Sequence, residues 1–114
     1  MVTPTAGIVV LVPFPFSDLS KTELRPAVVL ADSGRADRIL CQITSKPYGD
    51  PKAITLSDKS FDRGSLRTIS YARPGKLFTA NSSLMITQIG SLKDKILKNI
   101  IESVISILRN GIKN

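Results

Sequence analysis

The chain contains no histidine and a single cysteine, Cys41, and these two shortages exclude much familiar chemistry. Without histidine there can be no Ser-His-Asp triad and no pair of histidines acting as acid and base in a ribonuclease. A single cysteine provides neither a disulfide framework nor a cysteine-based zinc site. The sequence also lacks a P-loop, a glycine-rich dinucleotide turn and an acidic cluster suited to two metal ions. It therefore predicts neither a metal nor a cofactor.

Long apolar runs are absent too. No run approaches the roughly 18 residues that a membrane span requires. The first residues, Met1-Val2-Thr3-Pro4, lack the charged-then-apolar order of a signal peptide. We therefore expect a cytoplasmic protein that does not associate with membranes. With 114 residues, 42% of them hydrophobic and 22% charged, the chain predicts one domain over residues 1–114 with a single core.

Acidic residues are few. Nine Asp and Glu stand against sixteen Lys and Arg, which gives a net charge of +7. No acidic residue lies between Arg63 and Lys93, a stretch that also contains Arg67, Arg73 and Lys76. A basic excess favours a polyanionic partner because binding releases the counterions of the phosphates. A solvated basic surface is the alternative, and the long acid-free stretch favours nucleic acid over it.

The residue pattern predicts a mainly β fold. Apolar runs separated by turn signals predict strands at about residues 8–12, 26–31, 38–44, 53–56, 66–72 and 84–89. Two prolines predict a loop over residues 13–21, and Asp32-Ser33-Gly34 predicts a turn. Short strands of this kind favour a small, strongly bent sheet or barrel.

A helix is predicted after the last strand, because apolar residues recur at helical spacing from Leu92 to Leu108. Ser91 and Asp94 resemble a capping box at its start, and Gly111 is placed for a C-cap. The apolar stripe is wider than one sheet face needs. It predicts a helix that closes the barrel, with a second face that could serve a dimer.

A phosphate site is suggested by Arg25, which directly precedes Pro26 and the apolar run 27–30. Proline pushes the residue before it into an extended conformation, so we expect a strand to begin here with the guanidinium at its edge. The strand at 38–44 ends in Ile43-Thr44-Ser45, which delivers two hydroxyls. Arginine can pair bidentately with phosphate and stays charged at biological pH. A strand start whose charge points into water would also explain Arg25 alone.

Alternation along the strand at 38–44 places Cys41 on one face with Ile39 and Ile43. If that face packs inward, Cys41 is a small buried apolar residue with no chemical role. With the other nucleophiles and metals excluded, nucleic-acid chemistry is left with the 2′-hydroxyl of RNA itself. Its attack on the adjacent phosphorus would give a 2′,3′-cyclic phosphate and a 5′-hydroxyl end.

Several segments together resemble the MazF/PemK toxins. They are residues 7–18, 24–30, 43–45, 73–78 and 89–92, and the resemblance runs from Gly7 to about Leu108. It implies an SH3-like barrel with a C-terminal helix, and a homodimer. It also implies a metal-independent, sequence-selective endoribonuclease toxin that cleaves single-stranded mRNA and is encoded beside a small acidic antitoxin.

The same resemblance implies the site residues. By position, the family's catalytic arginine falls on Arg25 and its catalytic threonine on Thr44. Arg25 would transfer protons and neutralise the phosphorane, while Thr44 would hydrogen-bond a phosphate oxygen. RNA-binding roles would fall to Ser45, Lys46, Arg73 and Lys76.

Two other functions stay open. Some family members place an acid two residues after the arginine that aligns with Arg73, where this chain has Gly75. Loss of that auxiliary acid/base could weaken catalysis, and the chain could then be a non-catalytic SH3-like module that binds RNA or DNA. The third hypothesis is a protein-interaction barrel whose basic face binds an acidic, antitoxin-like peptide.

Overall fold

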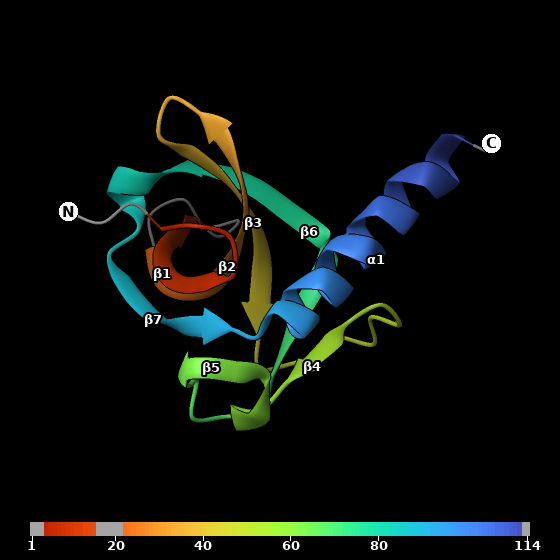
Figure 1. Ribbon diagram of the computed structural model, residues 1–114, viewed down its shortest axis with the longest axis horizontal. Coiled ribbons are helices and arrows are strands. Elements are labelled where there is room, and N and C mark those ends of the chain that lie inside the picture. The colour runs from red at the N-terminus through yellow and green to blue at the C-terminus, as the bar shows by residue number, and fades with distance from the viewer. Residues whose placement is uncertain (1–3, 16–21, 113–114) are drawn as a thin grey trace.

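The computed structural model describes residues 4–15 and 22–112, which form seven strands and one long helix (Figure 1). The strands are β1 (Ile8–Pro15), β2 (Thr22–Gly34), β3 (Asp37–Thr44), β4 (Ile54–Leu56), β5 (Phe61–Gly64), β6 (Ser70–Asn81) and β7 (Thr87–Leu92). Short 3₁₀ turns, η1 (Asp58–Ser60) and η2 (Ser82–Leu84), precede β5 and β7, and α1 (Asp94–Ile112) follows β7. None of the helices in these ranges is long and apolar enough to cross a membrane.

The strands form one antiparallel sheet in the order β4-β6-β3-β2-β1-β7-β5. The sheet curls into a half-barrel, with α1 beside β6 (Figure 1). This confirms the predicted fold class, a mainly β, SH3-like small barrel with a C-terminal helix.

Both faces of the central strands are buried, as their unbroken apolar runs predict. Val9, Val28 and Cys41 belong to a cluster that also packs against α1. Residues of the same three strands that point the other way form a second cluster on the opposite face: Val10, Val12, Ala27, Val29 and Leu40. The alternation of side chains along each strand explains this division. Cys41 is fully buried, as expected, and burial raises the pKa of its thiol to about 12.

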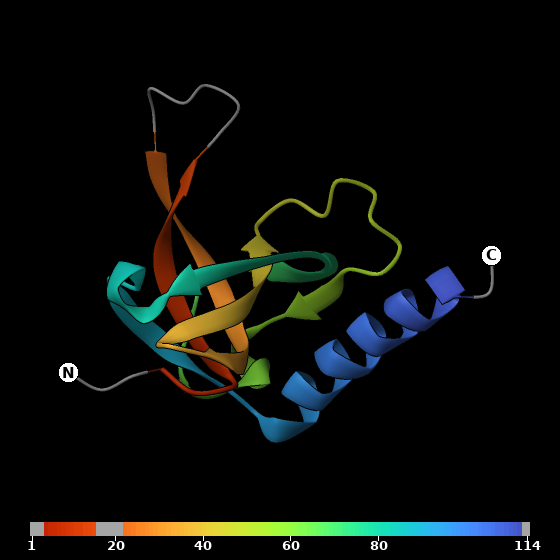
Figure 2. The ribbon, with the colours of Figure 1, turned by 90° about the horizontal axis from the view of Figure 1, so that it is seen from above.

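Only part of α1 packs on the barrel. Ile100 is completely buried in the first core cluster, and Ile96, Leu97, Ile101 and Val104 pack against this cluster. The last turns project away from the sheet (Figure 2), and Ile105, Leu108 and Ile112 are 38%, 64% and 83% exposed. The wide apolar stripe is therefore used on the barrel at its N-terminal half and exposed to solvent at its C-terminal half.

The predicted caps of this helix are wrong. The Lys93 carbonyl accepts hydrogen bonds from the amides of Ile96 and Leu97, so the helix begins after Lys93. Ser91 instead lies in β7, paired with β1 and β5, because the sheet continues through Leu92. Gly111 lies within the last turn of α1.

The loop expected at residues 13–21 is wrong over 13–15, where β1 continues and pairs with β2. The β1–β7 ladder ends at Leu11, whose carbonyl accepts from the Ile86 amide on that side. The backbone nitrogens of Pro13 and Pro15 point to the same side as that of Leu11, because the backbone groups of alternate residues in a strand point the same way. Their missing N–H groups therefore cost no ladder bond. Residues 16–21 lie outside the described residues.

The hairpin turn between β2 and β3 lies later than predicted. β2 continues through Gly34, whose amide donates to the Asp32 carboxylate at 2.8 Å. The chain reverses at Arg35 and Ala36, both with φ near +60°, as a two-residue hairpin turn of the primed type requires. Asp32-Ser33-Gly34 therefore forms a local side-chain hydrogen bond at the end of β2 and is not the turn itself.

The strand expected at residues 66–72 is largely a loop, and β6 runs on to Asn81 through Pro74. A wide bulge makes this possible. Cys41 pairs with Leu77 and Ile43 with Ala72, so Gln42 alone on β3 faces residues 73–76 on β6. Pro74 lies within this bulge, where no ladder bond requires its nitrogen.

Candidate active site

A cleft opens where β2 and β3 separate. The ladder between these two strands ends at the pair Ala27 and Gln42. Beyond this pair β2 continues along β1, with Arg25 opposite Val12, whereas β3 continues along β6, with Thr44 opposite Tyr71. Pro26 stands at the fork, where the β2–β3 ladder has ended and a missing N–H is tolerated. The expectation that a strand begins at Pro26 is therefore wrong, but the proline does mark an edge.

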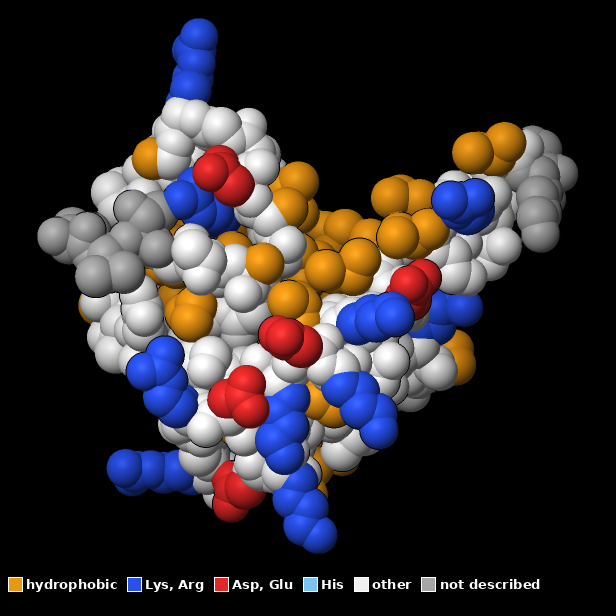
Figure 3. Space-filling model, viewed as in Figure 1, with side chains coloured by type: hydrophobic (Ala, Val, Ile, Leu, Met, Phe, Trp, Pro, Cys, Tyr) orange, Lys and Arg blue, Asp and Glu red, His pale blue; other side chains and the backbone are white. Residues whose placement is uncertain are grey.

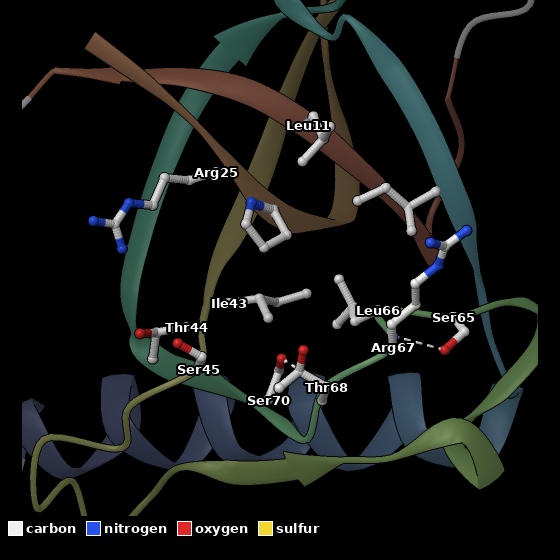
Figure 4. Close-up of a pocket in the computed structure, with 12 residues that line it drawn as sticks. Leu11, Arg25, Ile43, Thr44, Ser45, Ser65, Leu66, Arg67, Thr68 and Ser70 are labelled. Carbon is white, nitrogen blue, oxygen red and sulfur yellow. Dashed lines mark hydrogen bonds between the residues drawn. The ribbon is translucent and has the colours of Figure 1, made fainter. Parts of the chain in front are cut away.

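The cleft has a volume of ≈ 340 Å³. Its lining combines apolar, hydroxyl and cationic side chains: Leu11, Arg25, Pro26, Ile43, Thr44, Ser45, Ser65, Leu66, Arg67, Thr68, Ser70 and Ile89. Figure 4 shows Arg25, Thr44 and Ser45 at one end, Ile43 and Leu66 in the middle, and Ser65 with Arg67 at the other end. The predicted catalytic pair thus shares one cleft.

Arg25 lies on β2 at the mouth of the cleft, with 27% of its side chain exposed. One of its terminal nitrogens is 3.5 Å from the carboxylate of Glu23, two residues away on the same face of the strand. The Glu23 side chain is 65% exposed, so this pair contributes little to stability. The guanidinium is therefore partly exposed at the cleft, and its ion pair with Glu23 is weak.

Thr44, the last residue of β3, is only 3% exposed. Its Oγ1 accepts a hydrogen bond from the backbone amide of Lys46 at 3.2 Å. This bond fixes the position of the oxygen and leaves the hydroxyl proton available for donation. Ser45 and Lys46 follow with exposed side chains, and Ser45 lines the cleft.

Arg73 and Lys76 lie on β6 and do not line this cleft. Arg73 Nε donates to the Asp50 carboxylate at 3.0 Å, and the guanidinium stacks over the Tyr48 ring at 5.4 Å from its centroid. Both partners come from the loop between β3 and β4. Lys76 is exposed at the end of the β6 bulge. Among the predicted RNA-binding residues, Ser45 therefore joins the catalytic pair, Lys46 lies next to it, and Arg73 and Lys76 stand apart.

Asp50 is a residue that the sequence reading missed. Its carboxylate accepts from the Lys52 backbone amide at 2.9 Å as well as from Arg73. These hydrogen bonds, first that of Lys52 and then that of Arg73, lower the pKa of Asp50 below its ordinary value. The Cys41 thiol adds a bond to the Arg73 carbonyl at 3.2 Å. The Asp50–Arg73 pair therefore ties the loop between β3 and β4 to the β6 bulge, and the Cys41 bond ties β3 to the same bulge.

The loop between β5 and β6 supplies the far end of the cleft, and the sequence reading placed a strand there. Arg67 has φ of +66°, an uncommon conformation for a residue with a side chain. Its amide donates to the Ser65 hydroxyl at 2.8 Å, and that hydroxyl donates to the Asp58 carboxylate. The available signal was Gly64-Ser65, a turn dipeptide directly before Leu66.

Side chains that could bind a metal ion are sparse in the described part of the molecule. Over residues 4–15 and 22–112, no three His, Cys, Asp or Glu side chains cluster in a way that could hold a metal ion. The polar side chains that line the cleft are cations and hydroxyls, which suit a polyanion.

Comparison with known proteins decides the family. Residues 5–108 match the family model of the PemK-like, MazF-like toxins of type II toxin–antitoxin systems. The chain belongs to this toxin family. The family match confirms the resemblance drawn from the sequence motifs. None of the curated protein sequences compared with the chain matches it.

Solved MazF structures have the same fold. MazF (Form-I) from Deinococcus radiodurans has a TM-score of 0.73 at 21% identity, covering 95% of this chain and 98% of that one. MazE-MazF (Form-III) from the same organism has a TM-score of 0.75 at 20% identity, covering 94% and 97%. An endoribonuclease in complex with its cognate antitoxin, from Mycobacterial species, has a TM-score of 0.70 at 15% identity, covering 92% and 94%.

Proposed function

We propose that this PemK-like, MazF-like protein is a metal-independent, sequence-selective endoribonuclease that cleaves single-stranded mRNA in the cytoplasm. The observation that carries the proposal is the cleft, in which the side chains of Arg25 and Thr44 lie at the same end, beside Ser45. These residues come from two strands that diverge at this point. A partly exposed cation and a buried, fixed hydroxyl therefore line the same end of one cleft.

The chemistry needs no nucleophile from the protein. The 2′-oxygen of the substrate forms a bond to phosphorus and the bond from phosphorus to the 5′-oxygen breaks. The 2′-hydroxyl loses a proton and the departing 5′-oxygen gains one, which gives a 2′,3′-cyclic phosphate and a 5′-hydroxyl. Arg25 stabilises the charge of the phosphorane, and the Thr44 hydroxyl donates a hydrogen bond to a phosphate oxygen. The proton-transfer role of Arg25 follows from the family resemblance.

The place of Gly75 supports catalysis over the non-catalytic alternative. Gly75 is exposed in the β6 bulge, with open space where a Cβ would stand, and it does not line the cleft. An acid at this position would extend from the bulge, outside the residues that line the cleft. The chain therefore keeps the pair that the proposed chemistry uses.

We assign two protein partners to this toxin. An acidic antitoxin is favoured by the net charge of +7 and by the family, and it would inhibit growth arrest by closing the RNA site. A second copy of the chain is favoured by the exposed apolar residues Ile105, Leu108 and Ile112 on α1. Figure 3 shows apolar side chains gathered in the hollow between the barrel and the projecting part of this helix. Such a patch is typical of an interface.

The proposal is tested by incubating the purified protein with a long RNA in EDTA and mapping the cut ends. We expect cleavage at a restricted set of sequences, with 5′-hydroxyl ends, and no cleavage where the 2′-hydroxyl at the cut site is replaced by hydrogen. Metal-dependent cutting or 5′-phosphate products would falsify the mechanism. Tight binding without cutting would favour the non-catalytic RNA-binding module.

A further inference from the structure

The half of the cleft that Arg25 and Thr44 do not occupy has a composition of its own. The apolar residues that line the cleft are Leu11, Pro26, Ile43, Leu66 and Ile89, and Ile43 and Leu66 lie in its middle (Figure 4). The hydroxyls of Thr68 and Ser70 border this middle part, and Ser65 with the guanidinium of Arg67 lies at the far end (Figure 4). Figure 4 places Arg25 and Arg67 at opposite ends, with the apolar residues between them. A cation, an apolar floor and a second cation therefore follow one another along the cleft.

Single-stranded RNA has the matching order of groups. Successive phosphates are separated by a nucleoside whose base has apolar faces and hydrogen-bonding edges. Ligand pockets range from about 300 to 1,000 Å³. At ≈ 340 Å³ the cleft is near the lower limit and suits one nucleoside better than a longer segment. The hydroxyls of the β5–β6 loop stand where they can meet the edge of such a base.

Arg67 is held in place before any RNA arrives. Its backbone has φ of +66°, and its amide is bonded to the Ser65 hydroxyl, which is bonded in turn to Asp58. The loop starts at Gly64, where a Cβ would lie 2.1 Å from the Ile89 carbonyl of β7, so only glycine fits. A strained residue fixed by its surroundings is typical of a functional site.

No ion pair opposes the Arg67 charge within the described parts of the chain. Its side chain is exposed, in contrast to Arg73, which pairs with Asp50. A phosphate could therefore bind Arg67 without displacing a carboxylate.

We propose that the β5–β6 loop forms a nucleotide-reading subsite, in which Arg67 binds the phosphate next to the scissile one and Thr68 reads the base between them. This inference rests on the proposed ribonuclease function. It assigns part of the sequence selectivity to a loop that lies about twenty residues after the catalytic threonine in the chain. The apolar floor holds the base, and its edge is distinguished by hydroxyls.

The test measures binding of a short RNA that contains the mapped cleavage sequence with a 2′-deoxy nucleotide at the cut. Arg67→Ala should weaken binding roughly tenfold, the expected loss for one charge-assisted contact. It should also lower the slope of log affinity against log salt by about 0.7, the value of one phosphate contact on a single strand. Arg35→Ala is the matched control, because Arg35 carries the same charge at the other end of the β2–β3 hairpin. It should change neither quantity.

A chemical substitution in the RNA locates the contact. Replacing one of the two phosphates that flank the scissile one by an uncharged methylphosphonate should weaken binding of the parent protein. The same replacement should have no effect on Arg67→Ala. Additive losses, or losses at neither flanking linkage, would overturn the assignment of Arg67.

Base reading is tested by Thr68→Val, which removes the hydroxyl and keeps the shape of an exposed side chain. The preference for the base next to the cut should relax roughly fivefold, as expected for one lost hydrogen bond. An unchanged preference would overturn the role of Thr68. If the parent binds RNA without cutting it, the ribonuclease proposal fails. The salt slopes of Arg67→Ala and Arg35→Ala, measured on an unmodified RNA, still decide whether Arg67 holds a phosphate.

Discussion

Replacement of Asp50 should loosen the loop that begins at the catalytic threonine. The Asp50 carboxylate accepts two hydrogen bonds, from Arg73 Nε at 3.0 Å and from the Lys52 amide at 2.9 Å. The Asp50 side chain is 12% exposed and that of Arg73 is 18% exposed. Asp50→Ala removes both bonds and leaves a largely buried guanidinium without its carboxylate.

The size of this effect follows from the two contacts. A hydrogen bond to a charged group contributes about 1.5–3 kcal/mol, and the partial exposure of this pair favours the lower end for the two together. We expect Asp50→Ala to lower the free energy of unfolding by about 2 kcal/mol. With an unfolding entropy of about 2.1 cal/mol/K per residue over 114 residues, the melting temperature should fall by about 8 °C.

The effect on RNA should differ between binding and cleavage. Thr44 Oγ1 is fixed by the Lys46 amide at the start of this loop, so a looser loop places the hydroxyl less accurately. We expect cleavage at saturating RNA to fall by about tenfold. RNA affinity should change little, because neither Asp50 nor Arg73 lines the cleft.

The pH dependence gives a separate test. The pKa of Asp50 is lowered in the folded protein, so the ionised form stabilises the fold above the unfolded pKa. The stability difference between the parent and Asp50→Asn should be complete above about pH 5 and shrink as the pH falls below about 4. Thermal melts at one protein concentration measure it, with Asp62→Asn, an exposed acid on β5, as the control. An Asp50→Asn protein as stable as the parent at pH 7 would refute this reasoning.

Four further outcomes are expected. Thr44→Val should bind RNA with unchanged affinity and cleave it at least tenfold more slowly in single-turnover assays, since one donated bond is lost. Lys76→Ala should lower the salt slope of RNA binding by about 0.7 if this exposed lysine meets a phosphate, whereas an unchanged slope would mark it as solvated surface. Cys41, fully buried with its pKa raised to about 12, should resist thiol reagents at pH 8 until the protein is unfolded. Light scattering at micromolar concentration should report a mass of about twice 12.4 kDa, and a monomeric parent would contradict the dimer. Leu108→Glu should reduce this mass towards that of the monomer, because 64% of the Leu108 side chain is exposed.

Most of the strands, and the end of the cleft that contains Arg25 and Thr44, could be predicted from the sequence because each depends on local signals. Unbroken apolar runs predict strands covered on both faces, and Arg25-Pro26 marks the edge where β2 leaves β3. The run that ends in Thr44 points to the same edge from the other strand. Residue type and spacing alone predict extended strands and a terminal helix with an apolar stripe.

The remaining features depend on contacts between distant parts of the chain. Pro74 reads as a strand breaker, yet the bulge opposite Gln42 lets β6 pass through it. The partner of Arg73 is Asp50, 23 residues earlier in the chain, and no local pattern connects the two. Arg67 lies in a segment with β-forming neighbours, and its positive φ is imposed by Ser65 and the close approach of Gly64 to β7. Tertiary contacts override local preference at each of these positions.

The most direct test of the central claim is the single-turnover cleavage rate of Arg25→Ala, measured in EDTA with enzyme in excess over a short RNA that carries the mapped cleavage sequence. Loss of a group that stabilises the transition-state charge should lower the rate by about 10²–10³-fold, while Arg35→Ala cleaves like the parent. The RNA must remain bound by the variant under the conditions of the assay. An Arg25→Ala protein that cleaves at the parent rate would contradict the assignment of this cleft as the catalytic site.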